Sequence, residues 1–578
     1  MKRFPLIFIL LATTAVAVLL QLGEEYEFFF REQTLLFDSS LSGIASGLFQ
    51  VGGLSAVLSG LITQFFIFKY AGAIITGVLA GLGAWNLWKA TKAPGWLLPL
   101  CFLPFLSECI CLADQFYSYQ GFISFLLLIL ALRWYLPFSE GRPLRARVLA
   151  GTILTLALFV LAGPVATLLA LCIFVWTLLT DIRHWYAGLV PAAALAVLGL
   201  AFFLSGITDN FSRTFFAAGY FDELVYPRFF INLSWFLLPV VLVVAALFRK
   251  IEARSVIPSA ALTLLAAAFV FFGFRAVNDP LQYQLLKELH FAARGNWEAI
   301  YDDPAGKDPN YLFINLRNLA KSHLDLLPDR LFDSPQNGAK SILAASTGNN
   351  QNPDMASIMA WVYMRMGDVA AAQNAAFDAM VGYKWGSPYM ARILVQTNLV
   401  LGSPAIAEKY ICALEKTLFH SRWAREQRRF LCDDAAIEAD QLLSRYRSCV
   451  PSEDHLLASP GSDLRFILEA APADSAALGY YRSLLLLEGN LEEIKNYIEA
   501  TYAPGDAIPQ RLGEAYLVYF RSKNRTPDFG LISQEVAERY DSFIARFNEL
   551  AKKGLDPVQA IRGQYGDTFW YYMISVQR

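Results

Sequence analysis

The stretch that decides the fold runs from residue 256 to residue 280 and reads VIPSAALTLLAAAFVFFGFRAVNDP. Residues 256–274 carry no charge, and their length suits a helix that crosses a bilayer, which needs about 20 mainly apolar residues. Arg275 and Asp279 then open a part of the chain that is much richer in charge. The stretch therefore predicts a membrane-embedded domain over residues 1–275 and a water-soluble domain over residues 276–578.

The charge composition changes at the same boundary. Residues 1–275 hold 17 basic and 13 acidic side chains, and the remaining residues hold 31 basic and 37 acidic ones. Over the whole chain 17% of residues are charged and 56% are hydrophobic, whereas about a quarter of an ordinary soluble domain is charged. These values exclude a single soluble globular protein, a disordered chain and a small disulfide scaffold. With a net charge of −2, we expect no nucleic-acid partner.

Nine apolar segments of the first domain are predicted to cross the membrane. The fifth and the sixth meet at Gly163 and Pro164, a pair that favours a tight helical hairpin. The first segment follows Lys2 and Arg3 but lacks a clear cleavage site, so we interpret it as an uncleaved span. The nine segments are residues 5–22, 71–88, 95–112, 121–137, 147–162, 165–180, 187–204, 229–248 and 256–274.

A tenth apolar stretch, residues 53–68, is ambiguous, and the positive-inside rule decides how we interpret it. If this stretch does not cross, most basic loop residues lie in the cytoplasm, and the basic residues left outside are Arg31, Lys69, Arg213 and Arg228. If it crosses, every later loop inverts and most basic residues are exported. We therefore expect a multi-pass protein of a bacterial inner (cytoplasmic) membrane with a cytoplasmic N-terminus. The C-terminal domain is then extracytoplasmic, and periplasmic in a diderm bacterium.

The second domain has an apolar period of 3.6 residues, which predicts helices separated by short turns. Gly295, Gly367 and Gly489 are each followed by Asn or Asp, and Gly402 is followed by Ser. Glycine tolerates a left-handed turn, and Asn, Asp or Ser can cap the next helix. The stretch 361–377, WVYMRMGDVAAAQNAAF, resembles a tetratricopeptide repeat. We predict an irregular α-solenoid, although the uneven glycine spacing does not establish regular repeats.

Two interpretations of this solenoid are open. Such arrays bind polypeptides along a concave face, or this one only braces the membrane domain. The run RWAREQRR at residues 422–429 either binds phosphate or an acidic partner, or is a solvated helix face. Cys432 and Cys449 could pair in an oxidising compartment, but we favour free thiols.

The chain has none of the common catalytic motifs: no Walker loop, no dinucleotide-binding glycine pattern, no His-Glu-x-x-His and no nucleophile elbow. Its five histidines are scattered without metal-ligand spacing. Polar residues instead gather in the predicted outer loops, at residues 23–38, 108–120 and 206–228. A carboxylate there could deprotonate an acceptor or hold a divalent metal, and an arginine could hold a phosphate. The alternative is that these are ordinary loop acids and tyrosines of the interfacial belt.

The layout resembles the GT-C superfamily of multi-pass glycosyltransferases, which have a long acidic first outer loop and a second acidic position in the next outer loop. Some members end in tetratricopeptide repeats. The positions that match here are Glu32 or Asp38 in the first loop and Asp114 in the second. The first loop lacks the adjacent acidic pair that many such enzymes show, and Glu24-Glu25 comes nearest to it.

Across nearly the whole chain, the sequence also resembles an uncharacterised family of bacterial envelope proteins of this length. The matching stretches are EQTLLF (32–37), GL (53–54), LITQFF (61–66), GA (72–73), LAGP (161–164), NLVLG (398–402), AEKYI (407–411) and LEKTLFHSRWA (414–424).

The resemblance to GT-C enzymes implies sugar transfer from a polyprenyl-phosphate-linked donor on the outer membrane face. Glu32, Asp38 or Asp114 would be the catalytic base or a metal ligand. Arg213 or Arg228 would hold the phosphate, and the other substrate-binding candidates are Glu25, Gln33 and Tyr220. The alternative from a different class is a non-enzymatic scaffold whose helical array recruits envelope proteins. A transporter is the third hypothesis. It is weakened because Glu108, Arg133 and Arg147, the charged residues within the predicted spans, lie near span ends, whereas carriers usually keep ionisable groups near the middle of the membrane.

Overall fold

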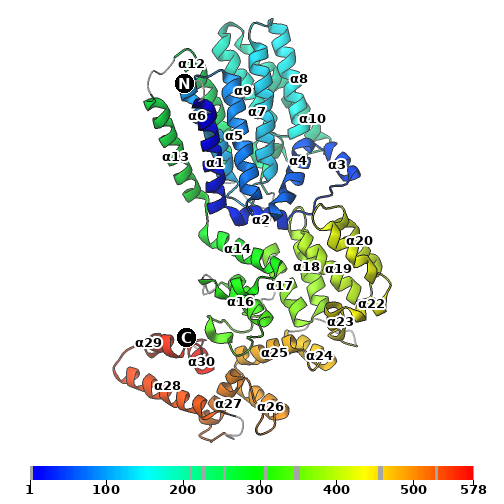
Figure 1. The fold of residues 1–578 in the computed structure, drawn as a ribbon, viewed down its shortest axis with the longest axis vertical. Helices are drawn as coiled ribbons and strands as arrows, with labels where there is room; N and C mark the ends of the chain where they lie inside the picture. The colour runs from blue at the N-terminus through cyan, green and yellow to red at the C-terminus, as the bar shows by residue number, and fades with distance from the viewer. Residues whose placement is uncertain are drawn as a thin grey trace. The chain divides into compact units, whose positions relative to one another are not determined.

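The computed structural model describes residues 4–208, 210–222, 225, 229–251, 256–304, 310–343, 352–452, 460–527 and 532–576. Within these ranges the chain folds into helices and turns without a β-strand (Figure 1), so the predicted all-α class is confirmed. Two compact units are present: Met1–Leu286 with Lys416–Phe419, and Lys287–Glu415 with His420–Arg578. The functional boundary after Arg275 stays a prediction.

Among its described residues, the first unit contains seven helices that are long and apolar enough to cross a membrane. Two other predicted spans, and the ambiguous stretch, form shorter apolar helices, Gly95–Cys111, Val165–Thr180 and Gly53–Ile67. The number of nine spans therefore stays a prediction. The apolar helices are α1 (Phe4–Gly23), α4 (Gly53–Gln64), α5 (Ala71–Thr91), α6 (Leu98–Cys111), α7 (Tyr119–Ser139), α8 (Leu144–Ala162), α9 (Val165–Thr180), α10 (Val190–Leu204), α12 (Leu233–Phe248) and α13 (Ile257–Val277).

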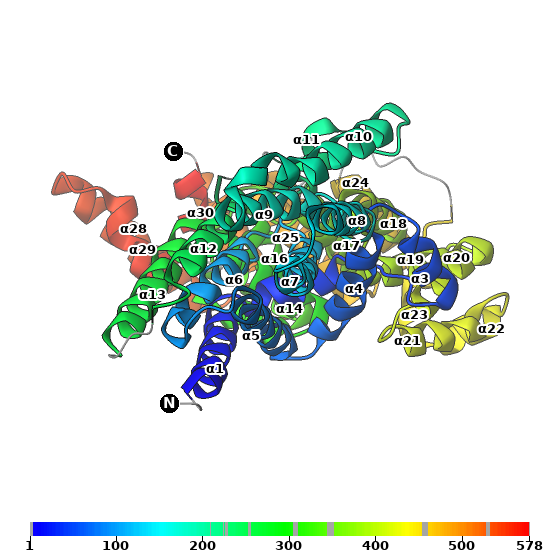
Figure 2. The same ribbon diagram turned by 90° about the horizontal axis from the view of Figure 1, so that it is seen from above.

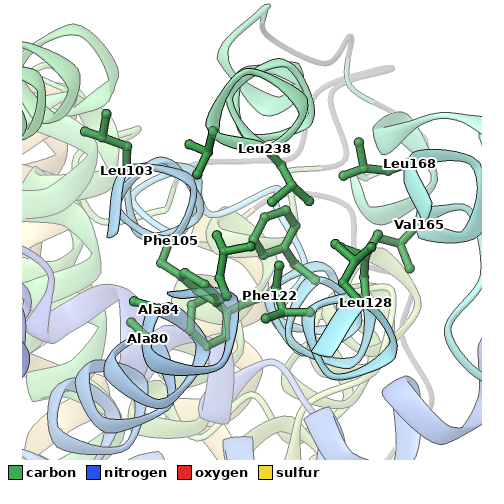
Figure 3. Packing of buried hydrophobic residues seen from close by; sticks show 14 of the residues in the cluster. Ala80, Ala84, Leu103, Phe105, Phe122, Leu128, Val165, Leu168 and Leu238 are labelled. Atoms are coloured by element: carbon green, nitrogen blue, oxygen red, sulfur yellow. The ribbon is translucent and has the colours of Figure 1, made fainter. Parts of the chain in front are cut away.

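Small residues on α5 allow its neighbours to approach closely. Ala80 and Ala84 are fully buried, and the ring of Phe105 on α6 lies against this face (Figure 3). A Cβ atom on Gly83 would lie 2.1 Å from that ring. Phe105 also meets Phe125 of α7 edge to face, with ring centroids 5.3 Å apart. Small-against-large packing of this kind is typical of helix interfaces in membranes.

One end of this bundle gathers α2 (Glu25–Gln33) with four connections, and we call it the α2 end (Figure 1). The loop between α6 and α7 and the segment before α12 meet there, because Ser118 N donates to Tyr220 O at 2.8 Å. Gly52 N donates to Val160 O at 2.8 Å, near the α8–α9 hairpin. Gln282, which follows α13, donates to Gln115 at 2.8 Å.

The opposite end gathers the other connections around ion pairs. Glu140, after α7, pairs with Lys92 and, at 2.8 Å, with Arg249. Arg147 pairs with Asp181 at 2.6 Å across the α8–α9 pair. The sequence assigns all of these loops to the cytoplasm, and the structure brings them together at one end.

The ambiguous helix α4 contacts the α2 end at both of its own ends. Gly52, which precedes it, lies at the α8–α9 hairpin. Phe66, which follows it, packs edge to face on Phe28 of α2 and on Tyr119 at the start of α7. Its 12 residues span about 18 Å at 1.5 Å per residue, which is shorter than the roughly 30 Å hydrocarbon core.

In the second unit, many consecutive helices pack against each other, among them α17 (Pro353–Met366) with α18 (Val369–Gly382) and α26 (Leu491–Thr501) with α27 (Gln510–Ser522). The four predicted glycines have the left-handed backbone, with φ of 69° at Gly295, 92° at Gly367, 71° at Gly402 and 68° at Gly489. The side chains of Asn296, Asp368 and Asn490 then cap the next helices, so these predicted turns are confirmed. Whether the helices form a solenoid stays a prediction.

The helices from residue 280 onward are α14 (Pro280–Arg294), α15 (Trp297–Asp302), α16 (Tyr311–His323), α17 (Pro353–Met366), α18 (Val369–Gly382), α19 (Pro388–Val400), α20 (Pro404–Glu415), α21 (Ser421–Gln427), α22 (Asp434–Ala439), α23 (Gln441–Ser448), α24 (Pro460–Ala470), α25 (Ser475–Glu488), α26 (Leu491–Thr501), α27 (Gln510–Ser522), α28 (Gln534–Lys552), α29 (Pro557–Tyr565) and α30 (Phe569–Val576). All seven cysteines are free, including Cys432 and Cys449.

Candidate functional site

The candidate site is built on α2, directly after the first apolar helix. Glu24 stands at its N-cap, and Arg31 lies in its last turn. Residues at positions i, i+3 and i+7 share one helix face, so Glu24, Glu27 and Arg31 point in the same direction. All three are buried, with exposures of 2%, 4% and 8%. The order of acids at the start and a base at the end also suits the helix dipole.

Arg31 joins α2 to the loop that follows α6. Its guanidinium donates hydrogen bonds to Leu112 O at 2.8 Å, to Asp114 O at 2.9 Å and to Tyr117 O. The last carbonyls of a helix have no partner within the helix and favour a nearby cation. Burial lowers the pKa of Arg31 below its ordinary value, and the carboxylates of Glu27 and Asp114 oppose that shift.

Glu24 is the member of this group whose carboxyl pKa is shifted toward neutral pH. Its Oε1 atom is buried and accepts no hydrogen bond from any residue in the described ranges. Burial penalises the charged carboxylate and raises the pKa of Glu24 to about 8, although the nearby Arg31 acts in the opposite direction. A carboxyl group with this pKa exchanges its proton near neutral pH.

Asp114 comes to the same place from the second outer loop. Its side chain is 5% exposed and accepts a hydrogen bond from Phe116 N at 3.0 Å. We call Glu24, Glu27, Arg31 and Asp114 the Arg31 cluster. The predicted candidate Glu32 is also buried on α2, with 4% exposure. Acids of the first and second outer loops therefore meet around one arginine.

The cluster continues toward the bundle interior through Tyr117. Its hydroxyl donates to Glu108 at 2.8 Å, while Ser234 of α12 donates to the other oxygen of Glu108 at 2.6 Å. Both oxygens of Glu108 therefore have fixed partners.

Asp38, the other predicted acid, has a different set of partners. Its Oδ1 accepts bonds from the backbone N and the hydroxyl of Ser40, at 2.9 and 2.5 Å, and its Oδ2 lies 3.0 Å from Lys416 Nζ. Burial alone would raise its pKa, but the bonds from Ser40 and Lys416 outweigh burial and hold the pKa below its ordinary value. These contacts give Asp38 a local structural role before α3 (Leu41–Leu48).

Two predicted substrate-binding residues also contact the backbone. Arg213 donates to Phe221 O at 3.2 Å and to Asp222 O at 2.9 Å. Tyr220 donates to Ala162 O at 2.5 Å and accepts from Val165 N at 3.1 Å, so it closes the α8–α9 hairpin.

Of the remaining predicted substrate-binding residues, the structure describes two. Glu25 is half-buried and Gln33 is 7% exposed, both on α2. Arg228 lies outside the described residues. Among the residues that the structure describes, no three His, Cys, Asp or Glu side chains form a group that could hold a metal ion.

The basic run at residues 422–429 is largely paired with acids. Arg422 pairs with Glu426 at 3.2 Å, and Arg428 pairs with Glu415 at 2.6 Å and with Glu408 at 3.2 Å. These contacts favour the solvated helix face over a phosphate site.

Our sequence reasoning missed Glu24, Glu27 and Arg31 as a unit. We treated residues 23–38 as a loop and weighed each acid by itself. The spacing of 24, 27 and 31 was the signal, because it places three charges on one face of any helix formed there.

The comparisons with known proteins give a family but no function. No curated protein and no solved structure matches the chain, so the resemblances to GT-C enzymes and to tetratricopeptide repeats stay predictions. A family model described as "Family of unknown function (DUF6057)" matches residues 1–575. Because this match covers nearly the whole sequence, the chain belongs to the DUF6057 family.

Proposed function

We propose that the protein is a membrane-embedded glycosyltransferase that uses a polyprenyl-phosphate-linked sugar, with its active centre at the Arg31 cluster. The observation that carries this proposal is the buried Glu24 carboxyl group, whose Oε1 has no hydrogen-bond partner among the described residues. It lies beside Arg31 at the meeting point of two predicted outer loops. Buried carboxyl groups with perturbed pKa values are characteristic of acid–base sites.

Glu24 supplies the proton acceptor for the reaction. An acceptor hydroxyl gives its proton to the Glu24 carboxylate while its oxygen bonds to the anomeric carbon of the sugar. The bond from that carbon to the phosphate oxygen breaks, and polyprenyl phosphate leaves. The charge of Arg31 favours ionisation of the buried Glu24, and its bonds to three carbonyls fix it as a positioning residue.

The arrangement of the bundle supports the topology that this reaction needs. All predicted outer connections with described contacts meet at the α2 end, and the Lys92, Glu140 and Arg249 group lies at the other end. Both ends of α4 contact the α2 end, which supports nine spans over ten. The proposed topology therefore has a cytoplasmic N-terminus, a periplasmic second domain and an active centre at the outer membrane face. Arg213 and Arg228 remain the candidates for holding the donor phosphate.

The test is sugar transfer by the purified full-length protein in lipid nanodiscs. Polyprenyl-phosphate hexose with a radiolabelled sugar is supplied, together with an extract of envelope acceptors. We expect labelled product with the wild type and a loss of at least 100-fold with Glu24→Gln, because general base catalysis contributes about 10²–10⁴-fold.

Glu298→Gln is the control, since Glu298 is an exposed glutamate of α15 in the second unit and lies outside the Arg31 cluster. It should keep most of the transfer. Equal transfer by the wild type and a correctly folded Glu24→Gln variant would remove Glu24 from the reaction. No transfer with any polyprenyl-phosphate sugar would refute the proposed function.

A second candidate function, a scaffold for envelope proteins, is favoured by one helix of the second unit. Phe377, Val381 and Trp385 follow one face of α18 and the turn after it, and they are 51%, 69% and 51% exposed. Exposed apolar side chains in one row are typical of protein-binding surfaces.

This candidate is tested by photo-crosslinking of the full-length protein in cells, with a photoreactive residue at Val381. Crosslinked partners that disappear with Phe377→Ser and Trp385→Ser would support the scaffold. The same pattern of products from a probe at Lys409, on α20, would show that the crosslinks are nonspecific.

A further inference from the structure

The helix α3 (Leu41–Leu48) turns its large apolar side chains away from the protein and its small residues toward it, the reverse of a surface helix in water. Its glycines lie toward the protein: a Cβ atom on Gly43 would be 2.3 Å from Asp38 Cγ, and one on Gly47 would be 2.9 Å from Val57 Cγ2. The large apolar side chains point away, with 88% exposure at Leu41 and 93% at Phe49, the C-cap residue. A helix that packs on a protein in water buries its apolar stripe instead.

The described chain covers α3 only in part, on the side of Gly43, Ile44 and Gly47. The helix has no buried residue, and Leu41, Ile44, Ala45 and Leu48 form an i, i+3, i+4, i+7 stripe. The serines lie to one side of this stripe. The whole stretch from residue 39 to residue 68 contains no charged residue. In water, such a helix would expose its apolar stripe without any compensating contact.

The surroundings of α3 are those of a membrane interface. The helix lies outside α4 at the α2 end of the membrane bundle (Figures 1 and 2). The chain that follows α4 exposes Phe65 by 43%, Phe68 by 53% and Tyr70 by 51%. Lys69 Nζ lies 5.2 Å from the centroid of the Tyr70 ring. Aromatic rings beside lysine are typical of the headgroup level, where the ring stays in the interface and the amine reaches water.

We propose that α3 lies in the plane of the bilayer at the α2 end, with Leu41, Leu48 and Phe49 inserted among the lipids at the boundary of headgroups and acyl chains. The occupant of this face is therefore lipid. The helix packs on α4, an apolar helix of the membrane bundle, and residues 39–68 offer no charge to a protein partner. Interfacial helices insert about 5–10 Å into this boundary. The inference does not depend on the glycosyltransferase proposal.

The test is a depth measurement on the full-length protein in liposomes of phosphatidylcholine and phosphatidylglycerol. Cys412 and Cys432, the two cysteines that are not buried, are replaced by serine. A nitroxide is attached at Phe49→Cys, and in a second sample at Ser46→Cys, on the serine side of the helix. Collisions with oxygen, which concentrates in lipid, are compared with collisions with a water-soluble nickel chelate.

We expect the ratio of oxygen to nickel collisions to be at least threefold higher at residue 49 than at residue 46. Equal ratios would show that the face is in water, and a label at residue 49 protected from both reagents would show that protein covers it. Either result would overturn the proposal. Leu41→Cys lies on the same outward face and replaces Phe49→Cys if the latter lowers the yield of folded protein.

Discussion

Glu24 and Arg31 are buried side by side, but burial has different consequences for the two. Arg31 has three carbonyl partners, and a guanidinium with so high an ordinary pKa stays charged. Glu24 has one oxygen without a partner in the described part of the chain, and its pKa of about 8 allows it to gain or lose a proton near neutral pH. This pair therefore joins one fixed positive charge to one carboxyl group with an exchangeable proton.

This difference predicts how sugar transfer depends on pH. The base must be ionised, so the rate at low donor concentration should rise about tenfold per pH unit up to about pH 8 and then level off. Arg31, Glu27, Asp114 and Tyr283 are the charged or titratable neighbours, and burial raises the pKa of Tyr283 well above this range. The measurement is a pH–rate profile in nanodiscs. A rate that is flat from pH 6 to pH 8 would contradict the assignment.

Other polar residues of the same region have structural partners that the sequence does not reveal. Asp38 pairs with Lys416, which lies far along the chain. Tyr220 donates to Ala162 O and so closes the hairpin between α8 and α9, which lies well before it in the sequence. Residue type and loop position predicted both as functional, but only the fold shows which backbone group each one contacts.

At the scale of the element, the glycines of α5 determine how closely its neighbours pack. Gly83→Ala would place a methyl group 2.1 Å from the buried Phe105 ring, and overpacking of this kind costs about 1–3 kcal/mol. We expect a lower midpoint of thermal unfolding in detergent. Gly23→Ala is the control, because nothing lies within 4 Å of a Cβ atom there. An unchanged midpoint for Gly83→Ala would show that α5 and α6 do not pack as described.

The turns of the second unit allow a matched comparison. Gly367 has φ of 92°, and an added Cβ atom would lie 2.8 Å from Cys449. Gly402 has φ of 71° with nothing within 4 Å. Alanine at Gly402 should cost about 1–2 kcal/mol for the left-handed backbone alone, and alanine at Gly367 should cost more. Thermal unfolding followed by circular dichroism measures both. A larger loss at Gly402 would contradict the packing of the Gly367 turn against Cys449.

At the scale of the whole molecule, the distribution of charge and the turn glycines could be read from sequence. Basic residues marked the loops around Glu140, and Gly-Asn or Gly-Asp pairs marked the helix ends, because both signals are local. The Arg31 cluster could not be predicted in full, since it needs α2 to be helical and the loop after α6 to lie against it. The contact of Asp38 with Lys416 depends on tertiary structure alone.

The topology makes a prediction for the intact cell. Asn278, after α13, and Arg142, after α7, are both exposed and lie at opposite ends of the bundle. Each is replaced by cysteine in a separate variant. With Cys412 and Cys432 replaced by serine, a membrane-impermeant maleimide should label residue 278 in spheroplasts and label residue 142 only after permeabilisation. The reverse pattern would place the Arg31 cluster in the cytoplasm and exclude a reaction at the outer face.

The central claim is that Glu24 serves sugar transfer at the membrane surface, and the envelope glycans of the native cell test it most directly. Glycans are profiled by mass spectrometry in a strain that lacks the gene and in the same strain carrying the wild type, Glu24→Gln or Glu298→Gln. We expect one glycan to be lost on deletion, restored by the wild type and by Glu298→Gln, and not restored by Glu24→Gln at equal protein level. Identical glycans in all four strains would contradict it.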